Sequence, residues 1–363
     1  MAPSRDRKQP LKGRGALSNP TGRFERHQRE AVADGWYQEE VPDFIPTSIE
    51  PDRARSVIAR NDSPDIPFEQ SINPYRGCSH SCPYCYARPS HSYVGLSAGL
   101  DFETRIFYRK DAGKVLEEEL SKPGYVCKPI TLGANTDPYQ PIERKLRVTR
   151  DILEVLARAR HPVTIITKGA LVLRDLDLLM DLARDGLAGV GVSITSLDVN
   201  LKRVMEPQAA SPHARLEAVR RLNEAGVPTG VLVAPVIPAL TDHELEAILE
   251  ASAAVGARWA GYVLLRLPYE VKDLFREWLA AHYPDRADHV MSLIRQMHNG
   301  KDYDSSFGTR MRGTGPLAEL LRSRFQIACR RLGLGTGRKQ PPNTSLFRPP
   351  KRAPSHPQLT LDL

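Results

Sequence analysis

Asn73-Pro74-Tyr75-Arg76-Gly77-Cys78-Ser79-His80-Ser81-Cys82-Pro83-Tyr84-Cys85-Tyr86 is the stretch that decides the fold, and it holds three of the five cysteines, spaced C-x3-C-x2-C. Thiolates on so short a loop can all face one soft metal centre. A structural zinc site usually has four ligands, often as two C-x2-C pairs, and no second pair follows. Three thiolates on a four-iron cubane leave one iron open to a ligand. The alternatives are a zinc loop completed by His80 or His91, or incidental buried cysteines.

The spacing, with the aromatic Tyr84 just before the third cysteine, resembles the radical S-adenosylmethionine (radical SAM) superfamily. The resemblance implies that Cys78, Cys82 and Cys85 bind a [4Fe-4S] cluster. It implies that SAM chelates the open iron, and that one electron splits SAM to a 5′-deoxyadenosyl radical, which abstracts hydrogen from a substrate. It also implies that Tyr84 packs beside the adenine.

Length and composition indicate a globular protein of 363 residues, 41% of them hydrophobic, with room for one large α/β domain and extensions. Five cysteines with three clustered do not form a disulfide framework. Reduced thiolates predict a cytoplasmic protein. No apolar run is long enough to span a membrane, and the polar N-terminus has no signal peptide.

From residue 71 onward, short β-rich runs alternate with helical patterns, which predicts about six parallel βα units. The expected strands are residue 72, 126–133, 162–167, 188–195, 229–236 and 260–266. The expected helices are 111–121, 149–160, 171–184, 213–225 and 241–255, the last opened by a capping box from Thr241 to Glu244. The pattern alone leaves an open doubly wound sheet as the alternative. The resemblance implies an α/β fold with a partial (β/α)6 TIM-type barrel and the cluster at the carboxyl ends of its strands.

Four regions are expected along the chain. Residues 1–70 form an extended, partly disordered basic arm that wraps the main domain; 71–268 form the radical SAM core; 269–335 form helices (270–282, 285–297, 316–332); and 336–363 form a disordered basic tail. The two ends carry most of the net charge of +8, which suits transient contact with phosphate backbones or simply solvated ends. The polar loop 300–310 is either a lid or a surface connection.

Polar residues follow three of the expected strands, where parallel sheets bind ligands. Thr136, Asp137 and Glu143 follow the second strand and can accept hydrogen bonds from the amino group of SAM. The alternative is an Asx turn at Asp137 before Pro138, with Glu143 solvated.

Lys168 follows the third strand and can pair with a carboxylate, or can be a surface lysine. Ser193 and Thr195 end the fourth strand and can bind ribose or carboxylate oxygens, or satisfy nearby backbone. Glu206 is a weaker candidate. Arg310 can meet a phosphate or lie solvated.

The Thr136-Asp137 segment up to Glu143, with Lys168 and Ser193, is similar to the spore photoproduct lyase branch of the superfamily. That branch carries a cysteine beside the Thr/Ser-Asp element as hydrogen donor. Here the preceding residues are Gly133-Ala134-Asn135, so dimer splitting by that route is in doubt and no catalytic residue is assigned. Cys127 and Cys329 are candidate hydrogen donors or ordinary buried cysteines. Residues 12–16 and 73–77 resemble an uncharacterised bacterial subgroup of this branch.

Residues 358–363, Gln358-Leu359-Thr360-Leu361-Asp362-Leu363, match the Q-L-x-L-x-L pattern of peptides that dock on the bacterial DNA sliding clamp. The interpretation is a cytoplasmic radical SAM enzyme for repair or modification of nucleic acid, served by an electron donor such as flavodoxin or ferredoxin. One alternative keeps the radical chemistry but acts on a protein or small molecule. The other is a non-catalytic Fe-S or zinc protein that binds nucleic acid.

Overall fold

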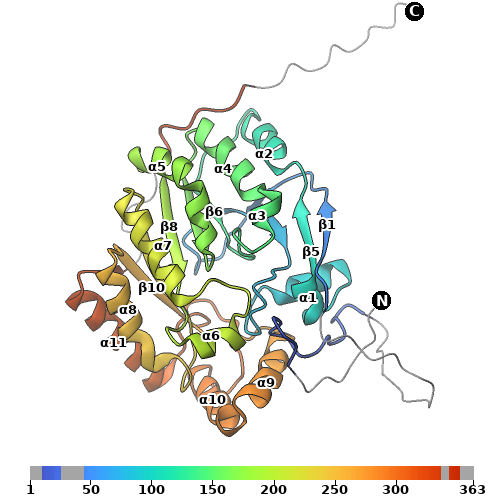
Figure 1. Ribbon diagram of the computed structural model, residues 1–363, viewed down its shortest axis with the longest axis vertical. Coiled ribbons are helices and arrows are strands. Elements are labelled where there is room, and N and C mark those ends of the chain that lie inside the picture. Colours follow the sequence, from blue (N-terminus) through green and yellow to red (C-terminus); the bar gives the residue numbers. More distant parts are fainter. Residues whose placement is uncertain (1–9, 26–44, 337–342, 352–363) are drawn as a thin grey trace, which may run out of the picture.

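The computed structural model describes residues 10–25, 45–336 and 343–351. Its centre is an eight-stranded sheet ordered β11-β10-β9-β8-β7-β6-β3-β2 (Figure 1). Every neighbouring pair is parallel except β2 with β3. The strands are β2 (Ile58–Arg60), β3 (Gln70–Ile72), β6 (Ile130–Leu132), β7 (Val163–Thr167), β8 (Ala188–Ser193), β9 (Thr229–Val236), β10 (Trp259–Leu264) and β11 (Gly335–Thr336).

The order of the strands decides between the two architectures that the pattern left open. From β3 through β6, β7, β8 and β9 to β10, the sheet follows the chain without a reversal. A doubly wound sheet reverses its strand order at a switch point, and none is present in this run. Right-handed crossovers then put the connecting helices on one face of the sheet. The six-unit partial barrel is confirmed.

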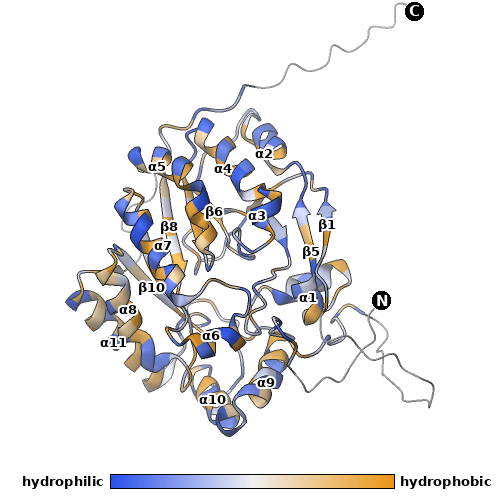
Figure 2. Cartoon of the chain, in the orientation of Figure 1, coloured by the Kyte–Doolittle hydropathy of each residue, from blue (hydrophilic) through white to orange (hydrophobic). Residues whose placement is uncertain are grey.

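Helices follow the strands. They are α2 (Ala112–Leu120), α3 (Glu143–Leu146), α4 (Val148–Arg158), α5 (Leu176–Arg184), α6 (Val199–Met205), α7 (Pro212–Glu224) and α8 (Leu245–Ala254), with 3-10 turns η1 (Arg88–Val94), η2 (Ala170–Asp175) and η3 (Asp242–Glu244). Helices α5, α7 and α8 pack directly on the sheet, whereas α6 packs beside the cysteine loop. In α4 the apolar residues Ile152, Leu153 and Leu156 are buried while charged residues face outward, and Figure 2 shows such stripes on several helices.

Two glycines, Gly191 in β8 and Gly230 in β9, leave space on the sheet for the large side chain of Trp259. A Cβ at Gly230 would lie 2.2 Å from the ring of Trp259, and one at Gly191 would lie 2.9 Å from it. The indole of β10 therefore lies directly over the backbones of β8 and β9. Larger residues at either glycine would displace it.

Two expected elements differ from the observed ones. β6 begins at Ile130 rather than at residue 126, because Pro129 lacks an N–H for the ladder, so Cys127 lies in the preceding loop. The capping box at Thr241 is absent. The Thr241 hydroxyl accepts the Ile237 N–H at 2.9 Å, and the Glu244 carboxylate binds Ser196 Oγ at 2.6 Å.

The region before residue 70 is more ordered than expected. β1 (Ser48–Asp52) pairs in parallel with β5 (Arg105–Arg109), which pairs antiparallel with β4 (Tyr75–Arg76). Pro51 is tolerated because β1 is the edge strand of this small sheet. The short helix α1 (Leu100–Thr104) leads into β5.

Residues 10–25, hereafter the N-terminal strap, correct the expectation of an unpacked arm. The strap has no helix or strand, yet Leu11, Ala16 and Leu17 are buried. Backbone N–H groups of the strap donate hydrogen bonds to the rest of the protein, so the apolar content of the segment alone did not reveal its packing. Of the aromatic residues in the region expected to wrap the main domain, Trp36, Tyr37 and Phe44 lie outside the described residues, and Phe68 is half-buried.

The C-terminal helices α9 (Val271–His282), α10 (Pro284–Met297) and α11 (Gly315–Arg331) agree with the prediction within two residues. Trp278 and Phe275 of α9 are buried in a second core cluster that also contains Cys82 and Tyr84. The helical extension thus packs against the cysteine loop. In the parts of the chain that are described, no helix combines the length and apolarity needed to cross a bilayer.

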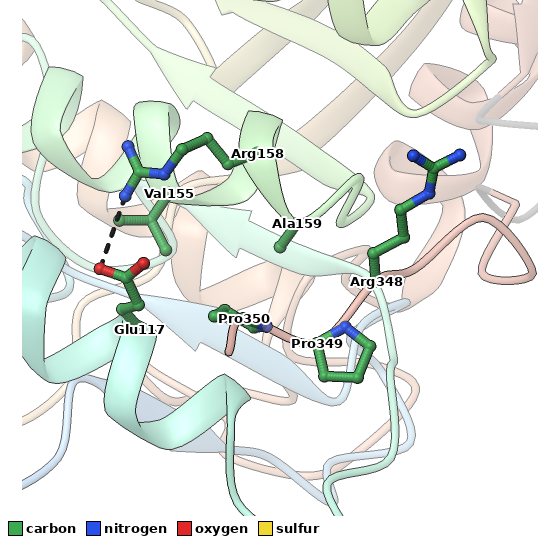
Figure 3. A pocket seen from close by; sticks show the side chains of 7 residues that line it. All are labelled: Glu117, Val155, Arg158, Ala159, Arg348, Pro349 and Pro350. Atoms are coloured by element: carbon green, nitrogen blue, oxygen red, sulfur yellow. Dashed lines mark ion pairs between the residues drawn. The ribbon is translucent and has the colours of Figure 1, made fainter. Parts of the chain in front are cut away.

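Residues 343–351 pack against the body of the protein. The ring of Phe347 lies 5.5 Å from that of Tyr125 and 5.3 Å from that of His161. The Arg348 N–H donates to the Ala159 carbonyl at 2.8 Å. A shallow cavity of about 210 Å³ lies alongside (Figure 3), lined by Glu117, Val155, Arg158, Ala159, Arg348, Pro349 and Pro350. The proposed clamp peptide 358–363 lies outside the described residues.

Candidate cluster and cofactor site

The cysteine loop follows β3 and β4 at the carboxyl end of the parallel strands, as expected. Successive turns shape it, with N–H donations from Ser81 to Cys78, from Cys85 to Cys82 and from Arg88 to Cys85. Gly77 has φ +80°, and a Cβ there would lie 3.0 Å from the Arg105 carbonyl and the His91 ring. The turns hold all three cysteines close to one another.

None of the three cysteines forms a disulfide; Cys78 and Cys82 are buried, and Cys85 is partly exposed. Burial, followed by the nearby Asp137 and Cys85, raises the pKa of Cys78 to about 12. Burial, Glu206 and the other two cysteines raise the pKa of Cys82 well above its ordinary value. Three thiolates in this loop would repel one another in the absence of a cation. A bound metal supplies the positive charge that makes deprotonation of the three thiols favourable. The donor set therefore fits a cationic metal cluster.

A single zinc ion fits less well. Within residues 10–25, 45–336 and 343–351, no three His, Cys, Asp or Glu side chains converge on one ion. His80 Nδ1 lies 3.4 Å from Asp137, and His91 Nε2 lies 3.0 Å from the Arg105 carbonyl. Neither histidine completes a tetrahedral site with the cysteines.

Asp137 joins the cysteine loop to two strand ends. Its Oδ1 accepts the Thr167 hydroxyl at 2.7 Å and the Tyr139 N–H at 2.9 Å, and its Oδ2 accepts the Lys168 N–H at 2.6 Å. Burial alone would raise the pKa of Asp137, but His80 and these donors hold it below the usual range. The carboxylate is thus ionised and acts as a brace. The Asx turn and the contact with the cysteine loop are both present.

Glu206, the weakest candidate from the sequence, lies at the centre of the site. Its carboxylate accepts hydrogen bonds from the hydroxyls of Tyr84 and Thr195 and forms an ion pair with Arg215. Lys168 Nζ lies 3.4 Å away. Burial alone would raise the pKa of Glu206, but the two cations lower it strongly. This one carboxylate connects the cysteine loop to the ends of β7 and β8.

Three predicted residues therefore meet at Glu206: Tyr84, Lys168 and Thr195. The Lys168 ammonium also donates to the Ala234 carbonyl at 2.9 Å, and it lies 5.9 Å from the centre of the Tyr84 ring. Ser193 reaches the group through its carbonyl, which accepts from Arg215 at 3.0 Å.

Two predicted residues are not brought to this group. Thr136 is buried beside the loop, with its hydroxyl donating to the Tyr75 carbonyl at 2.7 Å. Glu143 is buried at the start of α3, where it bonds the Tyr75 hydroxyl, the Thr149 N–H and the Arg174 guanidinium. Both oxygens of Glu143 are occupied by protein donors, so neither the SAM role nor the solvated alternative fits it.

Sequence reasoning missed Arg215 and Gln140. Gln140 Oε1 accepts the Ser79 N–H at 2.9 Å, and its Nε2 donates to the Gly77 carbonyl at 3.2 Å. Arg215 lies on α7, where the pattern predicts only a polar helix position. The partners of Gln140 are more than 60 residues away in the sequence, and Arg215 meets Glu206 only because the chain folds back between α6 and α7.

Comparison with known proteins identifies the family. The model of the radical SAM superfamily matches residues 72–251. An uncharacterised protein of Mycobacterium tuberculosis is 37% identical over 64% of this chain and 68% of its own length. An uncharacterised protein of Methanocaldococcus jannaschii is 30% identical over 59% of this chain and 76% of its own.

The chain belongs to the radical SAM superfamily. It is accordingly an enzyme, and the family implies a [4Fe-4S] cluster and SAM. Among solved structures, spore photoproduct lyase complexed with dinucleoside spore photoproduct matches with a TM-score of 0.58 at 17% identity, covering 79% of this chain and 81% of the lyase. A lyase variant with bound AdoMet and the same dinucleoside matches equally well, with a TM-score of 0.58, 17% identity, and coverage of 79% and 80%. At this identity the likeness concerns the fold.

Tyr86 directly follows the third cysteine of the loop, Cys85. The residue is 43% exposed, and its hydroxyl donates to the Ala134 carbonyl just after β6. The Arg266 guanidinium lies over the Tyr86 ring, 5.1 Å from its centre, and its Nη2 reaches Tyr303 at 3.4 Å. Arg266 Nε is buried without a hydrogen-bond partner. We call Tyr86, Arg266 and Tyr303 the mouth residues.

The loop 300–310 contributes Tyr303 to the mouth and is fastened at its far end. Arg310 Nε pairs with Asp65 at 2.7 Å, and the Met311 carbonyl accepts the Leu264 N–H at 2.9 Å. Arg310 is therefore paired with a carboxylate and mostly buried, so it is neither free for a phosphate nor solvated, the two possibilities that the sequence left open.

The remaining cysteines lie away from the mouth. Cys127 precedes β6, so it lies toward the amino end of the strands, opposite the cluster loop. Cys329 is buried in α11 within the main core. Both positions fit the ordinary structural reading rather than that of hydrogen donors.

Proposed function

We propose that this radical SAM enzyme holds its cluster through Cys78, Cys82 and Cys85 and modifies or repairs a nucleic acid. The observation that carries the cofactor assignment is the group of Tyr84, Lys168, Thr195 and Glu206 beside the loop that holds the three cysteines. When bound, the cluster and SAM supply a 5′-deoxyadenosyl radical for hydrogen abstraction. The protein's task is to hold SAM and exclude water.

Each residue of the group has a role that its contacts support. The Lys168 ammonium, oriented by Glu206 and the Ala234 carbonyl, can turn one N–H to the carboxylate of SAM. The Tyr84 hydroxyl is fixed on Glu206, which orients its ring. Asp137 contacts His80 and accepts the Lys168 backbone N–H, so it positions the cysteine loop in addition to any hydrogen bond with the SAM amino group.

The nucleic-acid substrate rests on three observations. The fold resembles a lyase solved with a dinucleoside photoproduct. The chain ends are basic. The exposed Tyr86 ring with Arg266 above it offers the stacking and cationic surface on which unpaired bases bind. Because Ala134 carries no thiol, we do not extend the proposal to dimer splitting through a cysteine. A protein or small-molecule substrate is the second candidate.

Anaerobic reconstitution tests the cofactor assignment. The wild type is expected to take up four irons per chain and to release 5′-deoxyadenosine from SAM under reductant. Cys82→Ala should lose both properties, whereas Cys127→Ala should retain them. Protein that carries only zinc, or Cys82→Ala protein that still releases 5′-deoxyadenosine, would end the proposal.

The substrate class needs a separate experiment. Nucleic acid from cells with and without the intact gene is digested to nucleosides and compared by mass spectrometry. We expect a nucleoside that differs only when the cluster cysteines are present. Identical nucleoside profiles, with a modified protein or metabolite instead, would favour the second candidate.

The partners are also proposals. Reduction of the cluster calls for an electron donor such as flavodoxin or ferredoxin. The terminal peptide 358–363 suits the sliding clamp, because leucines can enter an apolar pocket while Gln358 bonds its rim. Removing residues 358–363 should abolish binding to purified clamp. Unchanged affinity would exclude this recruitment.

A further inference from the structure

The N-terminal strap touches the cysteine loop backbone to backbone. A Cβ at Gly15 would lie 1.9 Å from the Ser81 carbonyl oxygen and 2.9 Å from Pro83 Cδ. Neither atom can move without reshaping the turn between Cys78 and Cys82. Only glycine allows the strap to lie so close to this loop.

A buried carboxylate fastens the strap at that point. Glu103, which is 0% exposed, accepts the Ala16 N–H at 2.8 Å and the Gly15 N–H at 3.1 Å. The same carboxylate pairs with the fully buried Arg88, whose Nε donates to the Cys82 carbonyl at 2.8 Å. One carboxylate thus links the strap to the backbone of a cluster ligand.

Two residues before Gly15, the strap contacts the second segment of the site. The Gly13 carbonyl accepts Gln208 Nε2 at 3.5 Å, and the Gln208 N–H donates to the His80 carbonyl at 3.4 Å. Gln208 is two residues from Glu206. The Arg14 guanidinium is held by the Glu103 carbonyl at 3.0 Å and by Thr47 Oγ1 at 2.9 Å. The strap therefore spans both segments that contribute to the proposed cofactor site.

From these contacts we infer that the strap is part of the cluster site: it closes the outer side of the cysteine loop and controls how fast water, oxygen and chelators reach the sulfur ligands. The protection of a cluster rests on the proposed function, whereas the protection of the Cys78 and Cys82 thiols by the strap does not require a bound cluster. Ordinary packing of a terminal segment would stabilise the fold generally. A strap that belongs to the site protects Cys78 and Cys82 specifically.

The test compares Gly15→Ala with Gly22→Ala in the full-length protein. Gly22 lies in the same strap, and a Cβ there would lie 3.3 Å from the flexible end of Glu25 and in ordinary contact, at 3.7 Å, with the Leu96 carbonyl oxygen. Alkylation of each cysteine in the metal-free protein is followed by mass spectrometry, and loss of the cluster to a chelator is followed by absorbance. Thermal melting of both variants monitors the fold.

Gly15→Ala is expected to accelerate alkylation of Cys78 and Cys82 on the order of tenfold, because local opening replaces a closed state. Alkylation of Cys329 in the core and the melting temperature should stay the same. The cluster should be lost faster in the same proportion. Glu103→Gln, which cannot accept both amide N–H groups and pair with Arg88, should act in the same direction.

Equal alkylation rates in Gly15→Ala and Gly22→Ala would overturn the inference, as would faster alkylation of Cys329 by the same factor, which indicates general unfolding. If the wild type takes up no cluster but Gly15→Ala still exposes Cys78 and Cys82, the inference about the strap is supported and the proposed function is refuted. The two ideas are thereby separated.

Discussion

Replacing Glu206 by Gln removes one negative charge from the most connected carboxylate of the site while keeping its shape. Arg215, whose side chain is 1% exposed, and Lys168 then face no opposing charge there. Removing one partner of a buried ion pair typically costs about 3 to 5 kcal/mol. The hydroxyls of Tyr84 and Thr195 can still donate to the amide oxygen. We therefore expect a loss of unfolding free energy within that range.

The loss of unfolding free energy in Glu206→Gln should depend on pH in a defined direction. Because the folded-state pKa of Glu206 lies below the ordinary value of 4.5, its stabilising contribution is fully present above pH 4.5. It is lost as the pH falls from there toward the lower folded-state pKa. Glu206→Gln has no such titration. The difference in stability between wild type and variant should be constant near neutral pH and should narrow below about pH 4.5.

Urea denaturation of the metal-free protein at several pH values measures this difference. Glu250→Gln is the matched control, because Glu250 pairs with Arg331 on the surface, where such pairs contribute about 0 to 1 kcal/mol. The reasoning is refuted if Glu206→Gln costs no more than Glu250→Gln, or if the difference does not change between pH 7 and roughly pH 3.5.

Three further predictions concern ligands and the mouth. Lys168→Met should weaken SAM binding by about 10- to 100-fold in calorimetry, as expected for loss of a charge-assisted hydrogen bond; an unchanged Kd would remove Lys168 from the SAM site. Arg266→Met should weaken binding of single-stranded oligonucleotides and reduce its salt dependence in anisotropy titrations; an unchanged titration would argue against the mouth as a nucleic-acid surface. Asp65→Asn, which leaves Arg310 without its carboxylate, should raise amide hydrogen exchange in the loop 300–310 without changing exchange in α4; unaltered exchange in the loop would show that Asp65 does not fasten it.

The sequence predicted the barrel well because periodic burial is a local signal. β9 matches its predicted bounds, and the six parallel strands appear in the predicted order. β1, by contrast, could not be predicted from Ser48-Ile49-Glu50-Pro51-Asp52. It contains a proline and alternates weakly, and its strand state depends on pairing with β5, more than 50 residues away.

The site was predicted in part for the same reason. Cysteine spacing is local, so the loop was evident, and Lys168 and Thr195 were found because strand ends could be located. Glu206 looked like a turn residue because two of its partners, Tyr84 and Lys168, come from distant segments, and the other two reach it only through the folded β8–α7 connection. The strap looked like solvated chain because a Gly-rich segment can pack through backbone atoms, and composition does not record such contacts.

The position of Phe347 shows which edge of the barrel the C-terminal segment 343–351 covers. Ala159, which receives the Arg348 N–H, precedes β7 and so lies at the amino edge of the barrel, while Tyr86 lies at the carboxyl edge. Figure 1 shows the described chain leaving the body near α2 and α4, away from α9 and α10. Residues 343–351 therefore cover no part of the carboxyl edge, so a substrate that reaches Tyr86 does not meet this part of the C-terminal segment.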